Sequence, residues 1–271
     1  MIQGAAVAWE IEKRLSDTEQ EIADQALVAA LAAQAAWQEQ PVAIRNNDIG
    51  LFIAGATDYP VPVRNVAVRR IPDVNAHLFL DYADGFFGSK KRSFTVLCRD
   101  DESDLRAALV ERKAHLLGAG PRMVCRQPVS VPSPPELRLQ SITSAAEVKD
   151  LVAVVADAFG YPDGEAQACF ASVDTFPETV HGCLGYMKGA PMASAISLRS
   201  ETSATLDWVA TKPAARRKGY AYACVSLLAE DIFRRGIPLL FLTSTAGAAN
   251  LYRRAGFRVF GCLQVFLIAS R

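Results

Sequence analysis

The segment from Leu206 to Ala221, LDWVATKPAARRKGYA, contains the residues whose types and spacing best suit binding of a charged ligand. It predicts an apolar strand, a short loop and the start of a helix. The first amide groups of a helix have no acceptor within it, and with the helix dipole they attract anions such as a diphosphate. Gly219 would let that backbone approach phosphate oxygens closely. The alternative interpretation is a solvated basic turn ahead of an ordinary amphipathic helix.

A second segment, Asn250–Phe257, reads NLYRRAGF, and its Tyr252 lies 33 residues after Gly219. Between the two segments the apolar spacing predicts a helix over Tyr220–Arg235. The run Leu239–Thr243 is continuously apolar, which is typical of a strand buried on both faces. The two segments are therefore expected to be held together by a strand, a turn, a helix, a second strand and a short helix.

The two segments resemble motifs A and B of the GNAT acetyltransferase superfamily. In that family V-x-x-x-P-x-x-R-x-x-G-x-G/A is followed by a helix, an apolar strand and a helix ending L-Y-x-x-x-G-F. The resemblance covers about residues 136–271, and it is carried here by Val209–Pro213, Arg216–Ala221, Leu239–Thr243, Leu251-Tyr252 and Gly256-Phe257. It implies acetyl-CoA as cofactor and acetyl transfer to a primary amine of a small molecule or peptide, by direct attack in a ternary complex. A non-catalytic acyl-CoA-binding or sensing protein with the same fold is the alternative.

Residue by residue, the resemblance implies that the amides of Arg217–Ala221 hold the pyrophosphate. The strand end Val209–Thr211 would pair with the pantetheine like an added strand, and one of its amides would polarise the thioester carbonyl. Thr245 stands where many members carry asparagine, seven residues before the tyrosine. The implied cofactor-binding residues are Val209, Ala210, Thr211, Arg216, Arg217, Lys218, Gly219, Tyr220, Ala221 and Thr245.

Two residues are the catalytic candidates. The resemblance makes Tyr252 the acid that protonates the departing CoA thiolate; the alternative is a tyrosine packed under the cofactor. Asp207 is the nearest carboxylate that could deprotonate an ammonium group, unless it is a surface or structural aspartate. Strand alternation puts Asp207 on the same face as Val209 and opposite Trp208. His181 is a weaker candidate for the base.

The acceptor side is expected between Phe159 and Phe170 in this family. The aromatic residues there and on the neighbouring strand favour an apolar or aromatic amine, although core packing explains them equally well. These residues are Phe159, Tyr161, Phe170 and Trp208.

The composition of the 271-residue chain excludes several classes of protein. Its formal net charge is zero, whereas dedicated nucleic-acid binders usually carry a basic excess. No apolar run is long enough to span a membrane, and Met1–Trp9 does not read as a secretory signal. The six scattered cysteines form no C-x-x-C pair, which indicates reduced thiols and a cytoplasmic protein. Motifs for serine hydrolases, nucleoside triphosphatases and zinc sites are missing from the sequence, so we expect no metal.

A proline-rich stretch, QPVSVPSPP at Gln127–Pro135, predicts an extended linker. It divides the chain into residues 1–127, a linker at 128–135 and residues 136–271. Both parts close in the order helix, strand, helix, strand, which suggests a duplicated domain. The first copy resembles a degenerate GNAT-like domain, because no R-x-x-G-x-G/A loop precedes its last helix. Two unrelated α+β halves are the alternative.

The expected fold class is mixed α/β (α+β). It consists of tandem GNAT-like domains, each a central, mostly antiparallel sheet flanked by helices, with splayed strands in the second. Ser16 and Glu19 predict a capping box at the first helix. In the first half we also expect a helix over Asp104–His115 and a last strand beginning at Met123–Cys125. The partners expected are the amine substrate, no nucleic acid, no membrane and, as an open possibility, a second copy of the chain in a homodimer.

Overall fold

A computed structural model describes residues 9–59, 63–130 and 132–270 of the chain. The expectation about a secretory signal concerns Met1–Trp9. Most of that segment, residues 1–8, lies outside the described residues. Within the described part, no helix is both long enough and apolar enough to cross a membrane.

All the described strands belong to one sheet of 11 strands. Their order is β1-β2-β3-β4-β11-β5-β10-β9-β8-β7-β6, and most neighbours are antiparallel. The parallel pairs are β3 with β4 and β9 with β10. The strands are β1 (Ala43–Asn46), β2 (Gly50–Ala54), β3 (Asn65–Arg69), β4 (Phe94–Arg99), β5 (His115–Cys125), β6 (Leu137–Ser141), β7 (Val180–Met187), β8 (Ala190–Arg199), β9 (Ala204–Thr211), β10 (Leu240–Thr243) and β11 (Arg258–Ile268).

The last strand of each half lies in the sheet of the other half. β5 of the first half pairs with β10, and β11 of the second half pairs with β4, while β5 and β11 pair with each other in the middle. The same exchange of an equivalent element is familiar from domain swapping between protomers. The mixed α/β class is confirmed. The domain boundaries at residues 127 and 136 stay a prediction. Because the two halves share one sheet, these boundaries would describe a duplication of the sequence and not two separate sheets.

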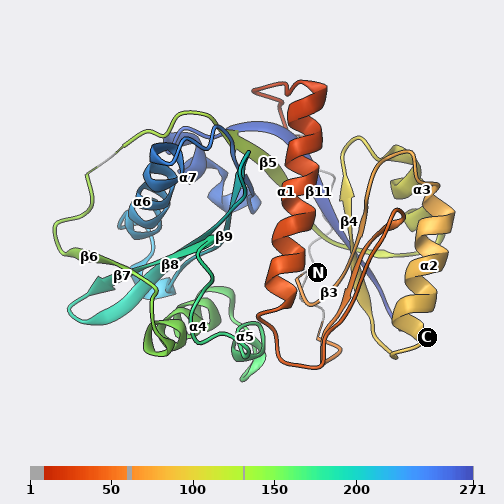
Figure 1. The fold of residues 1–271 in the computed structure, drawn as a ribbon, viewed down its shortest axis with the longest axis horizontal. Coiled ribbons are helices and arrows are strands. Elements are labelled where there is room, and N and C mark those ends of the chain that lie inside the picture. The colour runs from red at the N-terminus through yellow and green to blue at the C-terminus, as the bar shows by residue number, and fades with distance from the viewer. Residues whose placement is uncertain (1–8, 60–62, 131, 271) are drawn as a thin grey trace.

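Helices cover both faces of this sheet. α6 packs against Cys183 and Ala195, whereas α4 packs against the adjacent Leu184 and Ile196, so the two helices lie on opposite faces. α1 lies on the α4 face across the junction of the halves (Figure 1). The helices are α1 (Asp17–Ala35), α2 (Ala76–Gly88), α3 (Ser103–Glu111), α4 (Ala145–Phe159), α5 (Glu165–Ala168), α6 (Tyr220–Arg234) and α7 (Ala249–Arg254), with 3₁₀ turns η1 (Pro213–Ala215) and η2 (Ala246–Ala248).

The capping box predicted for α1 is confirmed. The Ser16 hydroxyl accepts from the Glu19 amide, and the Glu19 carboxylate accepts from the Ser16 amide. The alanine-rich helix has little side-chain bulk to bury, so it leaves space between itself and the sheet. That space becomes important for the site described below.

The last helix and strand of the first half differ from their predicted bounds. The helix α3 ends at Glu111, and β5 already begins at His115 and runs through Gly118 and Gly120. The predicted helix extended to His115 and the predicted strand began only at Met123, but β5 is flanked by β11 along most of its length. Pairing with a strand more than a hundred residues away therefore outweighed the local signal.

Gly120 makes the tightest backbone contact in this shared region. A Cβ atom placed on it would lie 1.9 Å from the carbonyl oxygen of Ser244, whereas a Cβ on Gly118 in the same strand would meet nothing within 4 Å. Gly120→Ala is therefore expected to destabilise the protein by about 1–3 kcal/mol or more, as overpacking does. Urea denaturation of full-length protein measures the effect. Gly118→Ala is the control, and equal stabilities of the two variants would contradict this packing.

Candidate functional site

The turn that leads into α6 is an uncapped set of amide donors. Arg217 and Gly219 both adopt left-handed backbone conformations, with φ of 64° and 82°. Gly219 is the N-cap of α6 and supplies no side-chain cap, and the first helical bond is donated by Ala223 to the Gly219 carbonyl at 3.0 Å. The amides of residues 217–222 donate to no acceptor in the described part of the chain. Such a curved row of free amides at a helix N-terminus is suited to an anion.

Solvent reaches this turn, because residues 216–219 are all exposed. A Cβ on Gly219 would meet only Pro134, at 3.6 Å, which is an ordinary contact. The Arg216 side chain is already used, since its guanidinium donates to the Ala158 carbonyl at the end of α4 at 2.7 Å. Arg216 therefore holds the turn against α4, and no side chain of the described residues closes it.

β9 and β10 diverge beside this turn. They pair only through Ala204 with Leu240 and Thr205 with Phe241, although β9 continues to Thr211. The β10-facing edge of β9 is consequently free from Leu206 onwards. A free strand edge can accept an extended ligand as an added strand. The predicted splay of the strands is confirmed.

A bulge at Trp208 changes the faces of β9. Trp208 has a φ of 51°, and the register with β8 slips between the pairs Ser194–Ala210 and Ile196–Asp207. The Trp208 indole donates to the Gln34 side chain of α1 at 2.8 Å, and Asp207 also faces Gln34. The predicted alternation is wrong here: Asp207 and Trp208 share the α1 face, while Val209 packs on the α6 side. A bulge inserts one residue and breaks the period of two.

Asp207 lies deep among protein atoms at the wall of a cavity, where its carboxyl keeps a little accessible surface. Burial raises the pKa of this carboxyl above its ordinary value of 3.8, and hydrogen bonds from the Thr205 hydroxyl and from Gln34 oppose the rise. Thr205 donates to it at 2.7 Å. Because a raised pKa makes a carboxylate a stronger base, Asp207 is suited to take a proton from a ligand in the cavity.

Tyr252 lies on α7 and packs in the core shared with α6. Its side chain is buried against Phe257, with ring centroids 5.9 Å apart, and its hydroxyl bonds to none of the described residues. Burial raises the pKa of this hydroxyl, and the nearby charge of Asp207 raises it further. The Tyr252 hydroxyl thus stays protonated at neutral pH. It packs in the core on the α6 side of the sheet and does not line the cavity that contains Asp207.

Two other candidates are Thr245 and His181. Thr245 is the exposed residue before η2, and only its backbone carbonyl is used, accepting from Ala248 and Ser244. His181 bonds to Ser141 and to Asp231 of α6 and does not line the cavity that contains Asp207. Its contacts are those of a structural histidine. Among the described residues, no cluster of histidine, cysteine, aspartate and glutamate could hold a metal ion.

The cavity beside Asp207 has a volume of about 330 Å³ and lies between α1 and the sheet. Of the predicted acceptor-side aromatics, Phe159, Tyr161 and Trp208 line it. Phe170 does not; it packs behind Trp208, with ring centroids 4.8 Å apart. The volume lies within the range of about 300–1,000 Å³ that is usual for small-molecule sites.

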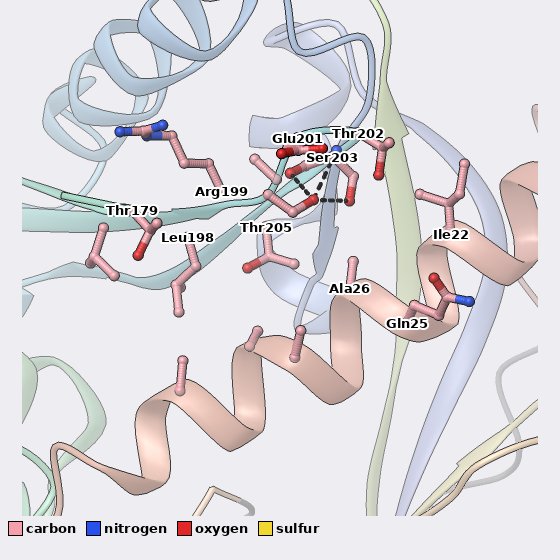
Figure 2. A pocket seen from close by; sticks show the side chains of 16 residues that line it. Ile22, Gln25, Ala26, Thr179, Leu198, Arg199, Glu201, Thr202, Ser203 and Thr205 are labelled. Atoms are coloured by element: carbon pink, nitrogen blue, oxygen red, sulfur yellow. Dashed lines mark hydrogen bonds between the residues drawn. The ribbon is translucent and has the colours of Figure 1, made fainter. Parts of the chain in front are cut away.

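A second hollow, which we call the α1 groove, adjoins this cavity and shares Ala30 and Thr205 with it. Its volume is about 520 Å³, and it runs between α1 and the ends of the neighbouring strands (Figure 2). Its α1 wall is formed mostly by small residues. That wall consists of Ile22, Gln25, Ala26, Ala29, Ala30 and Ala33. This wall of α1 is therefore partly exposed, and it lines a hollow next to the cavity that contains Asp207.

Several site residues come from the first half and were missed by the sequence analysis. Gln34 of α1 contacts both Trp208 and Asp207, and Arg122 of β5 lines the same cavity. No local motif marks them. They reach the site only because β5 is exchanged between the halves and α1 lies across both.

The equivalent position in the first half has no open turn. α2 follows the parallel strand β3 as α6 follows β9, but the Asn75 side chain caps α2 by accepting from the Leu78 amide at 3.0 Å. The neighbouring strands β3 and β4 stay paired over three residues, and at their ends Arg69 and Glu102 form a buried ion pair. The two halves thus differ at the feature that would bind an anion.

Comparison with known proteins gives consistent results. A model of the Acetyltransferase (GNAT) family matches residues 147–257. A GCN5-related N-acetyltransferase from Kribbella flavida superposes with a TM-score of 0.69 at 18% identity, over 91% of this chain and 95% of that one. One from Sphaerobacter thermophilus gives 0.60 at 14%, over 94% of each chain. No curated protein sequence matches significantly.

A tandem GNAT protein from the clavulanic acid biosynthesis pathway is similar along its whole length. It has a TM-score of 0.56 at 13% identity, over 94% of this chain and 96% of that one. At these identities the likeness concerns the fold. It confirms the tandem arrangement expected from the sequence.

Proposed function

Residues 147–257 form a domain of the acetyltransferase (GNAT) family, which makes this chain an acyltransferase, and from that premise we propose that it transfers an acetyl group from acetyl-CoA to a primary amine. The observation that carries the proposal is the open amide turn of α6 beside the free edge of β9, the strand that carries Asp207. Within the residues that the structure describes, only the second half has such a turn. We therefore assign one cofactor site per chain.

The residues of the turn and strand fit the cofactor. The amides of residues 217–221 would bind the pyrophosphate, and the exposed side chains of Arg217 and Lys218 add positive charge. The free edge of Val209–Thr211 would bind the amide groups of the pantetheine. Arg216 acts through its contact with α4 and positions the turn. When bound, acetyl-CoA supplies an acetyl group activated as a thioester.

The two catalytic candidates take complementary parts. Asp207 accepts the proton that an ammonium acceptor must lose before its nitrogen can attack the acetyl carbon. A C–N bond then replaces the C–S bond. Tyr252 would donate its hydroxyl proton to the departing sulfur. It would regain a proton, directly or through water, from the attacking nitrogen, which must lose a second proton to become the neutral amide. A strand amide of β9 near Val209 would stabilise the charge that develops on the carbonyl oxygen.

Gly219→Glu tests the cofactor site directly. A carboxylate at the mouth of the turn repels phosphate and competes for the free amides, so we expect the Kd for CoA to rise by about 10–100-fold, or about 1.4–2.8 kcal/mol. Titration calorimetry with CoA measures it. Gly236→Glu is the matched control, because Gly236 follows the other end of α6 with nearly the same φ, 81°, and has open space around it. Unchanged affinity in Gly219→Glu would remove the assignment.

A further inference from the structure

The cavity beside Asp207 contains a second ionisable group. Of the residues that line it, Asp207 is the carboxylate and Arg122 is the cation; the rest are apolar or neutral. The apolar wall is formed by both halves of the chain. It includes Leu27, Leu31, Leu97, Trp208, Phe241, Phe260, Leu263 and Val265. A ligand that fills this cavity would combine an apolar body with one positive and one negative group.

Arg122 is buried and incompletely paired. Its side chain is only 4% exposed, its guanidinium lies 4.8 Å above the ring of Phe260, and one nitrogen, Nη2, donates to Asp24 of α1. The other terminal nitrogen, Nη1, is buried and has no partner among the described residues. A buried donor without an acceptor is unfavourable, and an arginine is best satisfied by a planar carboxylate.

The one acid that pairs with Arg122 is shared with another arginine. Asp24 is shared, because its other oxygen lies 3.2 Å from Arg99, and Glu102 is likewise shared between Arg99 and Arg69. Three buried guanidinium groups thus meet two largely buried carboxylates. The further acids of the cluster, Asp101 and Asp104, are about half exposed at its outer side. With these two, the acids of the cluster outnumber the guanidinium groups, so what Arg122 offers a ligand is the unpartnered donor Nη1 and not an excess of positive charge.

We propose that the acceptor is a primary amine with an apolar body and a carboxylate, such as an apolar amino acid, whose carboxylate binds Arg122 while its amine faces Asp207. This inference rests on the proposed acetyl transfer and specifies its substrate class. The α1 groove (Figure 2) would give the acceptor a path to the cavity, because Ala30 and Thr205 line both hollows.

The test compares acceptors that differ only in the carboxylate. Full-length protein and acetyl-CoA are incubated with L-phenylalanine, L-phenylalaninamide or 2-phenylethylamine, and with leucine or isopentylamine, and free CoA is measured. We expect kcat/KM to be higher for each acid than for its uncharged partner by about tenfold or more, because a polar group left unpaired in the site is penalised. Equal values would overturn the inference and leave acetyl transfer standing. No release with any amine would overturn the proposed function itself, and this inference with it.

Variants of the protein test whether Arg122 causes the preference for acids. Arg122→Gln is expected to lose the preference for acids while it still acetylates 2-phenylethylamine, and Arg122→Lys, which keeps the charge, is expected to retain part of it. Arg126→Gln is the control, because Arg126 follows the same strand and pairs with Glu19 of α1 at 2.6 Å but does not line the cavity. An unchanged preference in Arg122→Gln, or one lost equally in Arg126→Gln, would contradict the assignment to Arg122.

Discussion

Tyr252→Phe is expected to lower kcat by about 10²–10⁴-fold, the usual contribution of a positioned acid. The hydroxyl bonds to none of the described residues, so its removal breaks no internal contact, and the ring can keep its place against Phe257. The Kd for CoA should therefore stay close to its original value. Steady-state CoA release and calorimetry measure the two quantities. A lower kcat with an unchanged Kd for CoA identifies an interaction made in the transition state and not in the ground state.

Tyr186→Phe is the matched control for this change. Tyr186 is as buried as Tyr252, each being 6% exposed, but its hydroxyl donates to Asp150 of α4 at 2.7 Å, outside the site. Its removal should cost stability by about 0.5–1.5 kcal/mol, as loss of a hydrogen bond does, and leave kcat unchanged. If Tyr252→Phe behaved in the same way, Tyr252 would be a packing residue, and the acid would have to be sought elsewhere.

The second half was largely predictable because its signals are local. The glycine at 219, the helix that follows and the apolar run that forms β10 each depend on residues close in sequence, and each is found where it was predicted. The bulge at Trp208 was not predictable in this way. Its conformation depends on the register with β8 and on the contact from its indole to Gln34, 174 residues away.

The first half shows where sequence reasoning fails for a physical reason. An exchanged strand takes its partners from the far end of the chain, so β5 carries no local sign that it will pair with β11 and β10. Arg122 stands just before the strand that was predicted to begin at Met123. It enters the candidate site only through that exchange, as Gln34 does through the position of α1.

Asp207→Asn is expected to lower kcat/KM by about 10²–10⁴-fold and to abolish the part of the pH profile that depends on this carboxylate. In the original protein kcat/KM should rise with pH as Asp207 loses its proton, at a pH above the ordinary range of aspartate because burial raises its pKa. In the variant the acceptor must lose its proton to solvent, so only the ionisation of the amine itself remains. Initial rates at saturating acetyl-CoA between pH 5 and 9 measure the profile.

The same substitution should stabilise the fold, and this separates a base from a structural aspartate. A carboxyl whose pKa is higher in the folded chain binds its proton more tightly there, so its contribution to stability is complete below the unfolded pKa of about 3.9 and is lost as pH rises through the folded pKa. Asparagine does not ionise, so the Asp207→Asn variant does not lose this stability as the pH rises. Urea denaturation should show the variant to be more stable at pH 8 and the difference to shrink toward pH 5.

Asp231→Asn is a comparison for which the expected change in stability has the opposite sign. Burial alone would raise the pKa of Asp231, but hydrogen bonds from Arg235 and His181 outweigh it and the net shift is downward. Its ionisation therefore contributes stability above the unfolded pKa, which is lost as pH falls through the folded pKa. This variant should be less stable at pH 8 and keep its activity. An Asp207→Asn protein that lost stability as Asp231→Asn does, with its pH profile intact, would show that Asp207 holds the fold together and that another group accepts the proton.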